Sequence, residues 1–463
     1  MYDTIIIGAG PGGYLAAERL GHEKKKTLLI EEQHLGGTCL NVGCIPTKTL
    51  LNSAKLYVHA KEAGKFGVTA KETSYDWPKI LAWKTEVTEK LRAGVAARMK
   101  RFGVEVVNGR GEIVSTASGE KGAKVKVFAD GKAEEYEAKT ILVSTGSAPV
   151  MPPIPGAKDN PRVVDSTGLL STPEVPKKLA IIGGGVIGVE FAGLFSALGT
   201  EVTVLEMMDE IVPFMDRELA PLLRKAMAPV GFKLGCKVER IEGAAVCYTE
   251  KDGKPGRVEA DLVLMAVGRR PVTGGWGAEV AGVDTGPKGV STDDRQRTNI
   301  PGIWAAGDLT GKSLLAHSAY RMAEVAVADI AAALDGKAAV ANVWRGSAVP
   351  WAVYGLTEAA GVGISEQEAA AKGVAIVKAS LPLVFSGRFV AENTFQAPGA
   401  VKVIASAETR RILGIHAVGA YSPEFIWGGA ALIEQELRVE DVKQLIFPHP
   451  TVCEVIRDAV WQL

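Results

Sequence analysis

The chain has 463 residues, of which 47% are hydrophobic and 23% are charged, so we expect a water-soluble globular protein of two to four domains. Lys and Arg number 53 and Asp and Glu also number 53, and this balance disfavours nucleic acid as a partner, because nucleic acid requires a basic surface. No uninterrupted apolar run approaches the roughly 18 residues of a membrane-spanning helix, so no membrane partner is expected.

The N-terminus leads almost at once into an apolar strand, Thr4–Ile7, which leaves no room for a signal or transit peptide. Only 5 cysteines are present in the chain. Together these features predict a cytoplasmic location in a reducing environment, or a mature chain from which a leader has been removed.

A glycine motif of the form G-x-G-x-x-G lies between the first two apolar strands. In chain order its parts are the strand Thr4–Ile7, Gly8, Gly10, Gly13, a helix-like stretch Tyr14–Leu20, the strand Thr27–Ile30 and Glu31. In this setting the first glycine makes a tight turn, the second lets the backbone approach a pyrophosphate, and the third permits close helix–strand packing. The glutamate can accept a hydrogen bond from a ribose hydroxyl. A single copy of the motif is often no more than a tight turn.

Two cysteines, Cys39 and Cys44, follow with four residues between them. A zinc site would need a second such pair, so the alternatives are a local disulfide, a redox-active dithiol, or two small core residues. Along an ideal helix the chain would rise about 7.5 Å between them, which is already beyond the Cα separation of roughly 4.4–6.8 Å that a disulfide accepts, but Gly43 permits a distorted turn. Pro46 suits the first turn of a helix over Thr47–Lys55, whose N-terminus would activate the second thiol. A reducing compartment disfavours a structural disulfide and so favours a catalytic pair.

A second glycine motif repeats the first. Its parts are the strand Leu179–Ile182, Gly183, Gly185, Gly188, a helix through Ala197, the strand Glu201–Leu205 and Glu206. In both copies the glutamate lies 18 residues beyond the third glycine (31 − 13 and 206 − 188). Two matching copies predict two dinucleotides, which in a redox enzyme suggest a flavin and a nicotinamide. Glu206 would repel the 2′-phosphate of NADP, and residues 207–209 supply no arginine to bind it, so we predict NAD.

These patterns predict an α/β fold with two Rossmann-like dinucleotide-binding domains, for FAD and NAD, and a C-terminal α+β dimerisation domain. We expect a β-rich insert near Ala123–Tyr136, and from about Trp344 alternating strands with two helices. Asp308, which ends another strand-like segment, could accept a hydrogen bond from a flavin ribityl hydroxyl. The predicted boundaries are 1–147 for the FAD domain, 148–273 for the NAD domain, 274–343 for a segment that completes the FAD domain, and 344–463 for the interface domain.

Longer motifs then occur in a distinctive order: GGTCLNVGCIPTK around the cysteines, STGSAP at 144–149, GGGVIGVEFAG at 183–193, NIPGIWAAGD at 299–308 and FPHPT at 447–451. On these motifs the chain resembles the class I pyridine nucleotide–disulfide oxidoreductases over essentially its whole length. Within that family it is most similar to the branch that oxidises dihydrolipoamide.

The resemblance implies roles for the two thiols. Cys39 would be the interchange thiol that meets the substrate, and Cys44 the thiol against the flavin. Lys48 would lie by the flavin N5 and pair with Glu190, because a nearby cation stabilises the charge that reduction creates; the alternatives are a solvated lysine and a helix-surface glutamate. No metal site is expected. The cofactor-binding positions expected are Gly8, Gly10, Gly13, Glu31, Lys48, Gly111, Ser144, Thr145, Gly146, Asp308, Ala316, Gly183, Gly185, Gly188, Glu190, Glu206, Val238 and Gly268.

His449 is the expected catalytic base. Pro448 and Pro450 stiffen its backbone, and Glu454 can orient one imidazole nitrogen so that the other takes a thiol proton. In this family the base comes from the partner subunit, so the resemblance implies a homodimer built on the C-terminal domain. His317 remains ambiguous, and structural or surface roles are expected for His22, His34, His59 and His416.

The resemblance implies that a dihydrolipoyl dithiol, carried on a lipoyl domain of another chain, is oxidised to its cyclic disulfide and that the electrons pass through FAD to NAD. That other chain would belong to a 2-oxo acid dehydrogenase or glycine cleavage complex. The alternatives are an NAD-linked oxidoreductase for another dithiol, a non-catalytic flavoprotein scaffold subunit, and a passive thiol sensor. Two details depart from the family pattern: Leu356-Thr357 stands where a His-Pro pair is common, and Cys453 adds a third thiol beside Glu454.

Overall fold

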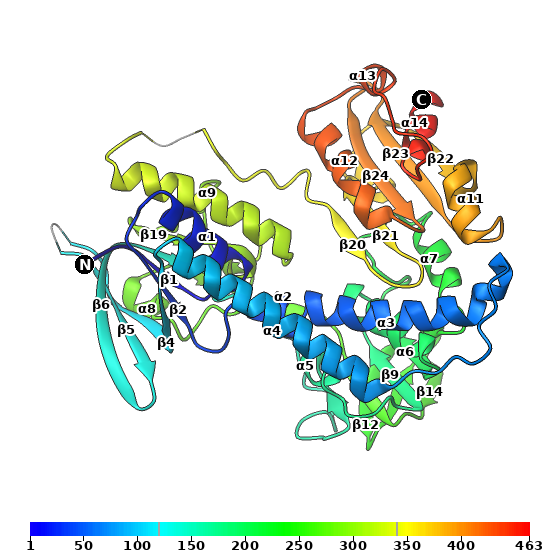
Figure 1. The fold of residues 1–463 in the computed structure, drawn as a ribbon, viewed down its shortest axis with the longest axis horizontal. Coiled ribbons are helices and arrows are strands. Elements are labelled where there is room, and N and C mark those ends of the chain that lie inside the picture. The colour runs from blue at the N-terminus through cyan, green and yellow to red at the C-terminus, as the bar shows by residue number, and fades with distance from the viewer. Residues whose placement is uncertain (119–120, 339–340) are drawn as a thin grey trace. The chain divides into compact units, whose positions relative to one another are not determined.

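The computed structural model describes residues 1–118, 121–338 and 341–463, which form two compact units (Figure 1). Unit 1 consists of Met1–Thr49, Lys79–Val150 and Arg269–Gly346, and unit 2 of Leu50–Pro78, Met151–Gly268 and Ser347–Leu463. The domain boundaries expected from the sequence remain predictions. Within the described ranges, we find no helix with the length and apolar character needed to cross a membrane.

A seven-stranded sheet forms the centre of unit 1. Its strands are β1 (Tyr2–Ile7), β2 (Thr27–Glu31), β3 (Glu105–Asn108), β4 (Arg110–Ser115), β5 (Ala123–Ala129), β6 (Lys132–Val143) and β19 (Ile303–Ala305). The order is β3-β2-β1-β6-β5-β4, and β19 also pairs with β6. The pairs β3·β2, β2·β1, β1·β6 and β6·β19 are parallel, as a Rossmann-like fold requires. β5 runs antiparallel to both β4 and β6, so the insert expected near Ala123–Tyr136 is an antiparallel extension of the same sheet.

Helices cover this sheet because they carry continuous apolar faces. On one face α1 and α9 pack together (Figure 1). Leu20 of α1 and Met322 of α9 are fully buried there. On the other face α8 packs with the buried ring of Trp276. The helices and short strands of unit 1 are α1 (Pro11–His22), α2 (Gly37–Val42), α8 (Ala278–Ala281), α9 (Ala316–Leu334), the 3-10 helix η2 (Gly307–Thr310), β7 (Ser147–Pro149), β16 (Arg269–Pro271), β17 (Thr285–Gly286) and β18 (Gly289–Val290).

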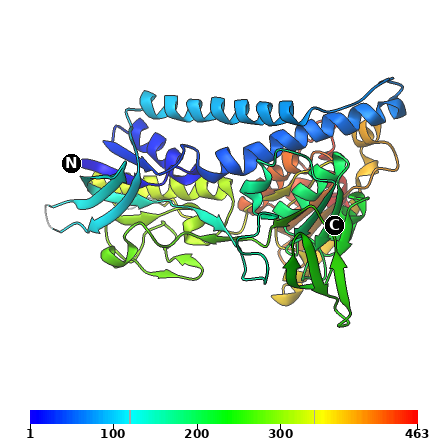
Figure 2. The same ribbon diagram turned by 90° about the horizontal axis from the view of Figure 1, so that it is seen from below.

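Two long helices, α3 (Cys44–Glu62) and α4 (Trp77–Arg101), each contribute residues to both units, and Figure 2 shows both as unbroken. The sequence predicted the first of these only over Thr47–Lys55. α3 is longer because no glycine or proline interrupts the chain between Pro46 and Gly64, where the 3-10 helix η1 (Ala63–Phe66) begins to turn the chain.

Unit 2 contains a parallel five-stranded sheet in the order β11-β10-β9-β15-β8. A three-stranded antiparallel sheet, β12-β13-β14, packs against it through a shared apolar cluster. The elements of this part are β8 (Val163–Val164), α5 (Ser166–Leu169), β9 (Lys178–Ile182), α6 (Val186–Ala197), β10 (Glu201–Leu205), α7 (Ala220–Ala226), β11 (Gly231–Lys233), β12 (Lys237–Glu242), β13 (Ala245–Thr249), β14 (Pro255–Val258) and β15 (Leu262–Met265).

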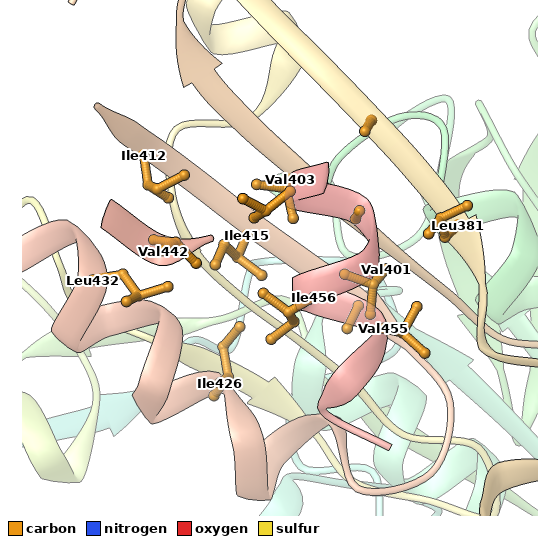
Figure 3. Close-up of a cluster of buried hydrophobic side chains, with 14 of the residues drawn as sticks. Leu381, Val401, Val403, Ile412, Ile415, Ile426, Leu432, Val442, Val455 and Ile456 are labelled. Atoms are coloured by element: carbon orange, nitrogen blue, oxygen red, sulfur yellow. The ribbon is translucent and has the colours of Figure 1, made fainter. Parts of the chain in front are cut away.

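The C-terminal part of unit 2 is an antiparallel sheet, β20-β21-β24-β23-β22, with helices over one face. Figure 3 shows the core between them, where Ile426 of α12 and Ile456 of α14 lie against Val403 and Ile415 of the strands. The expectation of two helices here was wrong: residues 344–463, all described, contain five, because helices of four to eight residues leave little periodic signal in a sequence. The elements are β20 (Trp351–Val353), β21 (Ala359–Gly363), α10 (Glu366–Ala371), β22 (Ile376–Pro382), the 3-10 helix η3 (Leu383–Phe385), α11 (Gly387–Asn393), β23 (Ala400–Ser406), β24 (Ile412–Val418), α12 (Ser422–Glu434), α13 (Val439–Val442) and α14 (Glu454–Trp461).

Candidate active site

The cysteine pair forms a disulfide. Cys39 lies on α2, Cys44 is the first residue of α3, and their Cα atoms are 4.7 Å apart. The two helices are separated by Gly43, whose φ and ψ of −145° and −109° break the helical path and so bring the cysteines within disulfide range. A side chain at Gly43 would meet the carbonyl oxygen of Thr38 at 2.9 Å. Thr47 then fixes the start of α3, since its hydroxyl donates a 2.6 Å hydrogen bond to the Gly43 carbonyl. Both cysteines are partly exposed.

In the first glycine loop, side chains at two of the three motif glycines would overlap the backbone. Gly8 has φ +96°, and a Cβ there would overlap the carbonyl of Ser144; a Cβ on Gly13 would overlap the carbonyl of Gly8. A Cβ on Gly10, by contrast, would meet nothing within 4 Å. Gly10 is also the N-cap of α1, where no side chain caps the helix. The open side of the loop therefore has the shape, and the helix N-terminus without a side-chain cap, that suit a pyrophosphate.

The second glycine loop repeats this geometry in unit 2. Gly183 has φ +108° and a Cβ there would overlap the carbonyl of Ala266, while a Cβ on Gly188 would overlap the carbonyl of Gly183. Gly185 again faces open space and caps α6 without a side-chain hydrogen bond. Both loops thus have the backbone shape expected from the sequence.

Each loop is closed by the glutamate at the end of its second strand. Glu31 accepts a 2.7 Å hydrogen bond from the amide of Ala9, and Glu206 accepts a 2.5 Å hydrogen bond from the amide of Gly184. Those amides occupy the same position, between the first two glycines of each motif. Both glutamate residues are 9% exposed. Each also accepts a hydrogen bond from an amide just beyond the strand, so its orientation is fixed where a ribose would lie.

Asp308 is held in unit 1 by two residues that sequence reasoning did not single out. The hydroxyl of Ser147 donates a 2.6 Å hydrogen bond to the Asp308 carboxylate, and Arg269 donates to that hydroxyl at 2.8 Å. Burial raises the pKa of Asp308, although the Ser147 hydrogen bond and the charge of Arg269 oppose the rise. The only signals in the sequence were the serine inside STGSAP and the arginine directly after Gly268.

The other expected cofactor positions are distributed over both units. Ser144 is buried at the end of β6 beside the first loop, and its hydroxyl donates to the carbonyl of Ala306 at 3.2 Å. Thr145 donates to the carbonyl of Val272 at 2.9 Å. Gly111 lies on β4, Val238 on β12, and Ala316 begins α9. Gly146 and Gly268 have φ of +74° and +118°, a conformation that favours glycine.

The predicted pair of Lys48 and Glu190 lies on two helices. Lys48 is partly exposed in the second turn of α3, in unit 1. Glu190 is 4% exposed on α6, in unit 2, and accepts a 3.1 Å hydrogen bond from the amide of Tyr354. Glu190 is therefore a buried residue and not one of the helix surface, while its pairing with Lys48 stays a prediction.

His449 and Glu454 meet as expected. Nδ1 of His449 lies 2.8 Å from one carboxylate oxygen of Glu454, and the other oxygen accepts a 2.7 Å hydrogen bond from the amide of Thr451. The His449 side chain is 78% exposed whereas Glu454 is 11% exposed. Burial alone would raise the pKa of Glu454, but the hydrogen bonds from Thr451 and His449 hold it below its ordinary value. The carboxylate thus stays ionised at neutral pH and orients a solvent-facing imidazole.

The two departures from the family pattern have simple structural settings. Leu356 is exposed in a loop, and Glu358, two residues further on, forms a 2.6 Å ion pair with Lys55 of α3. Cys453 is partly buried, and its sulfur lies 3.1 Å from the hydroxyl of Thr451. His416, by contrast, is a buried structural histidine bound to the carbonyl of Ile364.

Comparison with known proteins decides the family. Residues 2–323 match the family model described as pyridine nucleotide-disulphide oxidoreductase, and residues 349–460 match the dimerisation domain of the same group. The chain belongs to the pyridine nucleotide–disulphide oxidoreductases. Its fold class, its redox-active disulfide and its use of FAD and NAD are those of this family, as the sequence predicted.

Similar proteins span the full length of the chain. It is 38% identical over 472 residues to a dihydrolipoyl dehydrogenase of Thermus scotoductus, covering 99% of this chain and 96% of that protein. It is 36% identical over 466 residues to one of Bacillus subtilis, covering 99% and 95%. Among solved structures, LpdA from Mycobacterium tuberculosis gives a TM-score of 0.88 at 28% identity, covering 100% of this chain and 99% of that one. The Cu(II) complex of the HOCl-induced flavoprotein disulfide reductase RclA from Escherichia coli gives a TM-score of 0.86 at 29% identity, covering 100% and 99%.

Proposed function

We propose that this oxidoreductase converts a dihydrolipoyl dithiol into its cyclic disulfide and delivers the two electrons to NAD. The observation that carries the proposal is the disulfide between Cys39 and Cys44 at the start of α3, in a chain that also builds two dinucleotide loops. The relatives named dihydrolipoyl dehydrogenase support the choice of substrate.

The first half of the reaction is thiol–disulfide exchange. One substrate thiolate attacks Cys39, a substrate–Cys39 disulfide forms, and Cys44 leaves as a thiolate. The second substrate thiolate then attacks the substrate sulfur of that mixed disulfide, so the cyclic disulfide forms and Cys39 is released. The N-terminus of α3 favours the leaving group, because the positive end of the helix dipole stabilises a thiolate at Cys44.

His449 is the proposed base for the substrate thiols. Because its Nδ1 is bound to the carboxylate of Glu454, Nε2 is the ring nitrogen left to accept a proton, and the exposed imidazole is accessible to a substrate. Glu454 stabilises the imidazolium that results. We propose that this base serves the disulfide of the partner subunit in a homodimer, in keeping with the dimerisation-domain match.

The cofactors would bind at the two glycine loops. FAD held at the first loop would supply a two-electron acceptor for the Cys44 thiolate, and NAD held at the second loop would supply the final hydride acceptor. Glu31 and Asp308 would hold FAD hydroxyls, and Glu206 would hold the adenosine ribose of NAD. Cys39 and Cys44 reform their disulfide when the electron pair leaves them.

We further propose that the dithiol is carried on a lipoyl domain of another chain, in a 2-oxo acid dehydrogenase or glycine cleavage complex in the cytoplasm. The support is the names of the relatives and the partly exposed disulfide.

Steady-state rates with free dihydrolipoamide test the function directly. The purified protein should reduce NAD, and NADP should be at least about a hundredfold poorer because Glu206 and a 2′-phosphate repel each other. Turnover with a different dithiol but not with dihydrolipoamide would point to another NAD-linked disulfide oxidoreductase. A yellow protein with no turnover would indicate a scaffold subunit, and equal rates with NADP would overturn the cofactor assignment.

Replacing Glu206 should lower kcat/KM with NAD, in addition to reducing the preference for NAD over NADP. In Glu206→Ala with Met207→Arg, NADP should gain relative to NAD, since an arginine can bind the 2′-phosphate. Even so, kcat/KM with NAD should fall about tenfold, because the buried amide of Gly184 loses its acceptor. Met207→Arg alone is the control, as it leaves the loop intact. Unchanged kinetics with NAD in the double variant would show that Glu206 does not support the loop.

A further inference from the structure

A residue in a strained backbone conformation, Val212, forms a hydrogen bond to the second glycine loop. Val212 is fully buried and has φ +45°, a left-handed conformation that a β-branched side chain rarely adopts. From this conformation its amide donates a 2.8 Å hydrogen bond to the carbonyl of Gly184, inside the loop. Such strain persists only where the surroundings hold the segment in place.

The surroundings that hold this segment come from the C-terminal sheet of unit 2. Ile211, Val212 and Met215 share a buried apolar cluster with Val353 of β20 and Val418 of β24. A polar contact adds to this packing, since the side-chain amide of Gln367, on α10, donates to the carbonyl of Met215 at 2.7 Å.

A buried ion pair between Asp216 and Lys402 lies at the C-terminal end of the same segment. Asp216 and Lys402 are both 0% exposed and lie 2.9 Å apart. The second carboxylate oxygen of Asp216 accepts a 3.0 Å hydrogen bond from the amide of Glu366 at the start of α10. Lys402 also contacts the carboxylates of Glu218 at 2.8 Å and Glu366 at 2.5 Å. The lysine therefore offsets part of the negative charge of these three carboxylates, and removing one partner of such a buried pair leaves the other charge buried without its partner.

We propose that Lys402 and Asp216 are a positioning pair for the nicotinamide site. Because Lys402 belongs to the C-terminal sheet, the ion pair attaches the segment Ile211–Asp216 to that sheet. The attached segment keeps Val212 in its strained conformation. Val212 in turn holds the glycine loop, through its hydrogen bond to Gly184, in the shape that NAD binds. The inference rests on the proposed binding of NAD at this loop. It predicts that the pair affects NAD and NADH affinity but not the reaction of the disulfide with its dithiol substrate.

Lys402→Met is the first test, with Lys378→Met as the matched control. Lys378 is also a lysine on a strand that forms an ion pair with Glu366, but its side chain is 45% exposed. Within the part of the chain that the structure describes, Lys378 forms no ion pair with Asp216. In Lys402→Met the Kd for NADH should rise about tenfold, equivalent to about 1.4 kcal/mol. In Lys378→Met it should match the wild-type value. The measurements are fluorescence titration with NADH, FAD content, and stopped-flow reduction of the enzyme by dihydrolipoamide without NAD.

Asp216→Asn provides a second variant if Lys402→Met does not fold, because asparagine keeps the size of the side chain and can still accept from Glu366. Its NADH Kd should rise at least about threefold, while FAD content and reduction by dihydrolipoamide stay at wild-type values. Wild-type NADH affinity in either folded variant would overturn the inference. A parallel loss of NADH affinity, FAD content and dithiol reactivity would also overturn it, as it would show a general structural role. A wild-type protein that does not bind NADH would instead contradict the proposed function.

Discussion

Replacing Cys44 with serine is expected to reduce turnover by at least about a thousandfold, because the exchange then has no leaving thiolate and no disulfide to open. Reduction of the wild-type protein by two electrons should produce a long-wavelength absorption band from a thiolate beside the flavin. Cys44→Ser should lose this band, since Cys44 is the thiol assigned to the flavin side. Absorbance spectra during titration with dithionite, together with steady-state rates, provide the measurement.

Cys39→Ser separates the two roles. It should lose turnover to a similar extent, but it should keep a thiolate that can contact the flavin and hence keep the band. Cys453→Ser is the matched control, because its sulfur contacts the hydroxyl of Thr451 and not the disulfide. The control should turn over like the wild type. Loss of the band in Cys39→Ser and its retention in Cys44→Ser would mean that the roles are reversed.

Replacing His449 with glutamine should lower turnover with dihydrolipoamide by about 10²- to 10⁴-fold, the usual contribution of a general base. The spectrum of the oxidised flavin should remain unchanged, because His449 lies on an exposed turn and not in a dinucleotide loop. Turnover in the variant should recover most with substrates whose thiols are already ionised, which do not need a base. An unchanged rate would exclude His449 as the base.

A mixed-dimer experiment then asks which chain the base serves. Cys44→Ser and His449→Gln chains, unfolded together and reassembled, would give mixed dimers that hold one site with both residues intact and one with neither. About half of the dimers would regain half of their activity, roughly a quarter of the wild-type rate, if pairing is random. Each variant reassembled alone is the control. Verified mixed dimers without activity would show that the base acts within its own chain.

The parts of the fold that the sequence predicted are those in which a local pattern has a local cause. Gly8 and Gly183 could be interpreted correctly because each must pack against a neighbouring carbonyl with positive φ, and only glycine does so without strain. The disulfide was one of three alternatives until the resemblance favoured it, because its geometry depends on the break at Gly43. Short helices such as α10 and α13 escaped prediction, since a single turn carries no periodicity.

The supports of the site could not be predicted because they join distant parts of the chain. Asp216 and Lys402 are 186 residues apart, and although Lys402 is the single charged residue of the apolar strand Ala400–Ser406, nothing near it in the sequence identifies Asp216 as its partner. The contact of Ser147 with Asp308 spans 161 residues. The positive φ of Val212 is even less visible, because valine disfavours it and only the packing around the residue imposes it.

The double role of Glu206 constrains how such an enzyme can evolve. The side chain that we propose excludes NADP also accepts the hydrogen bond from the Gly184 amide, within the loop proposed to bind the remainder of either dinucleotide. A lineage that changes this residue first passes through a form that binds both nucleotides poorly. Adaptation to NADP is therefore more accessible when a new hydrogen-bond acceptor for the Gly184 amide arises before the glutamate is lost, and the order of mutations matters as much as their identity.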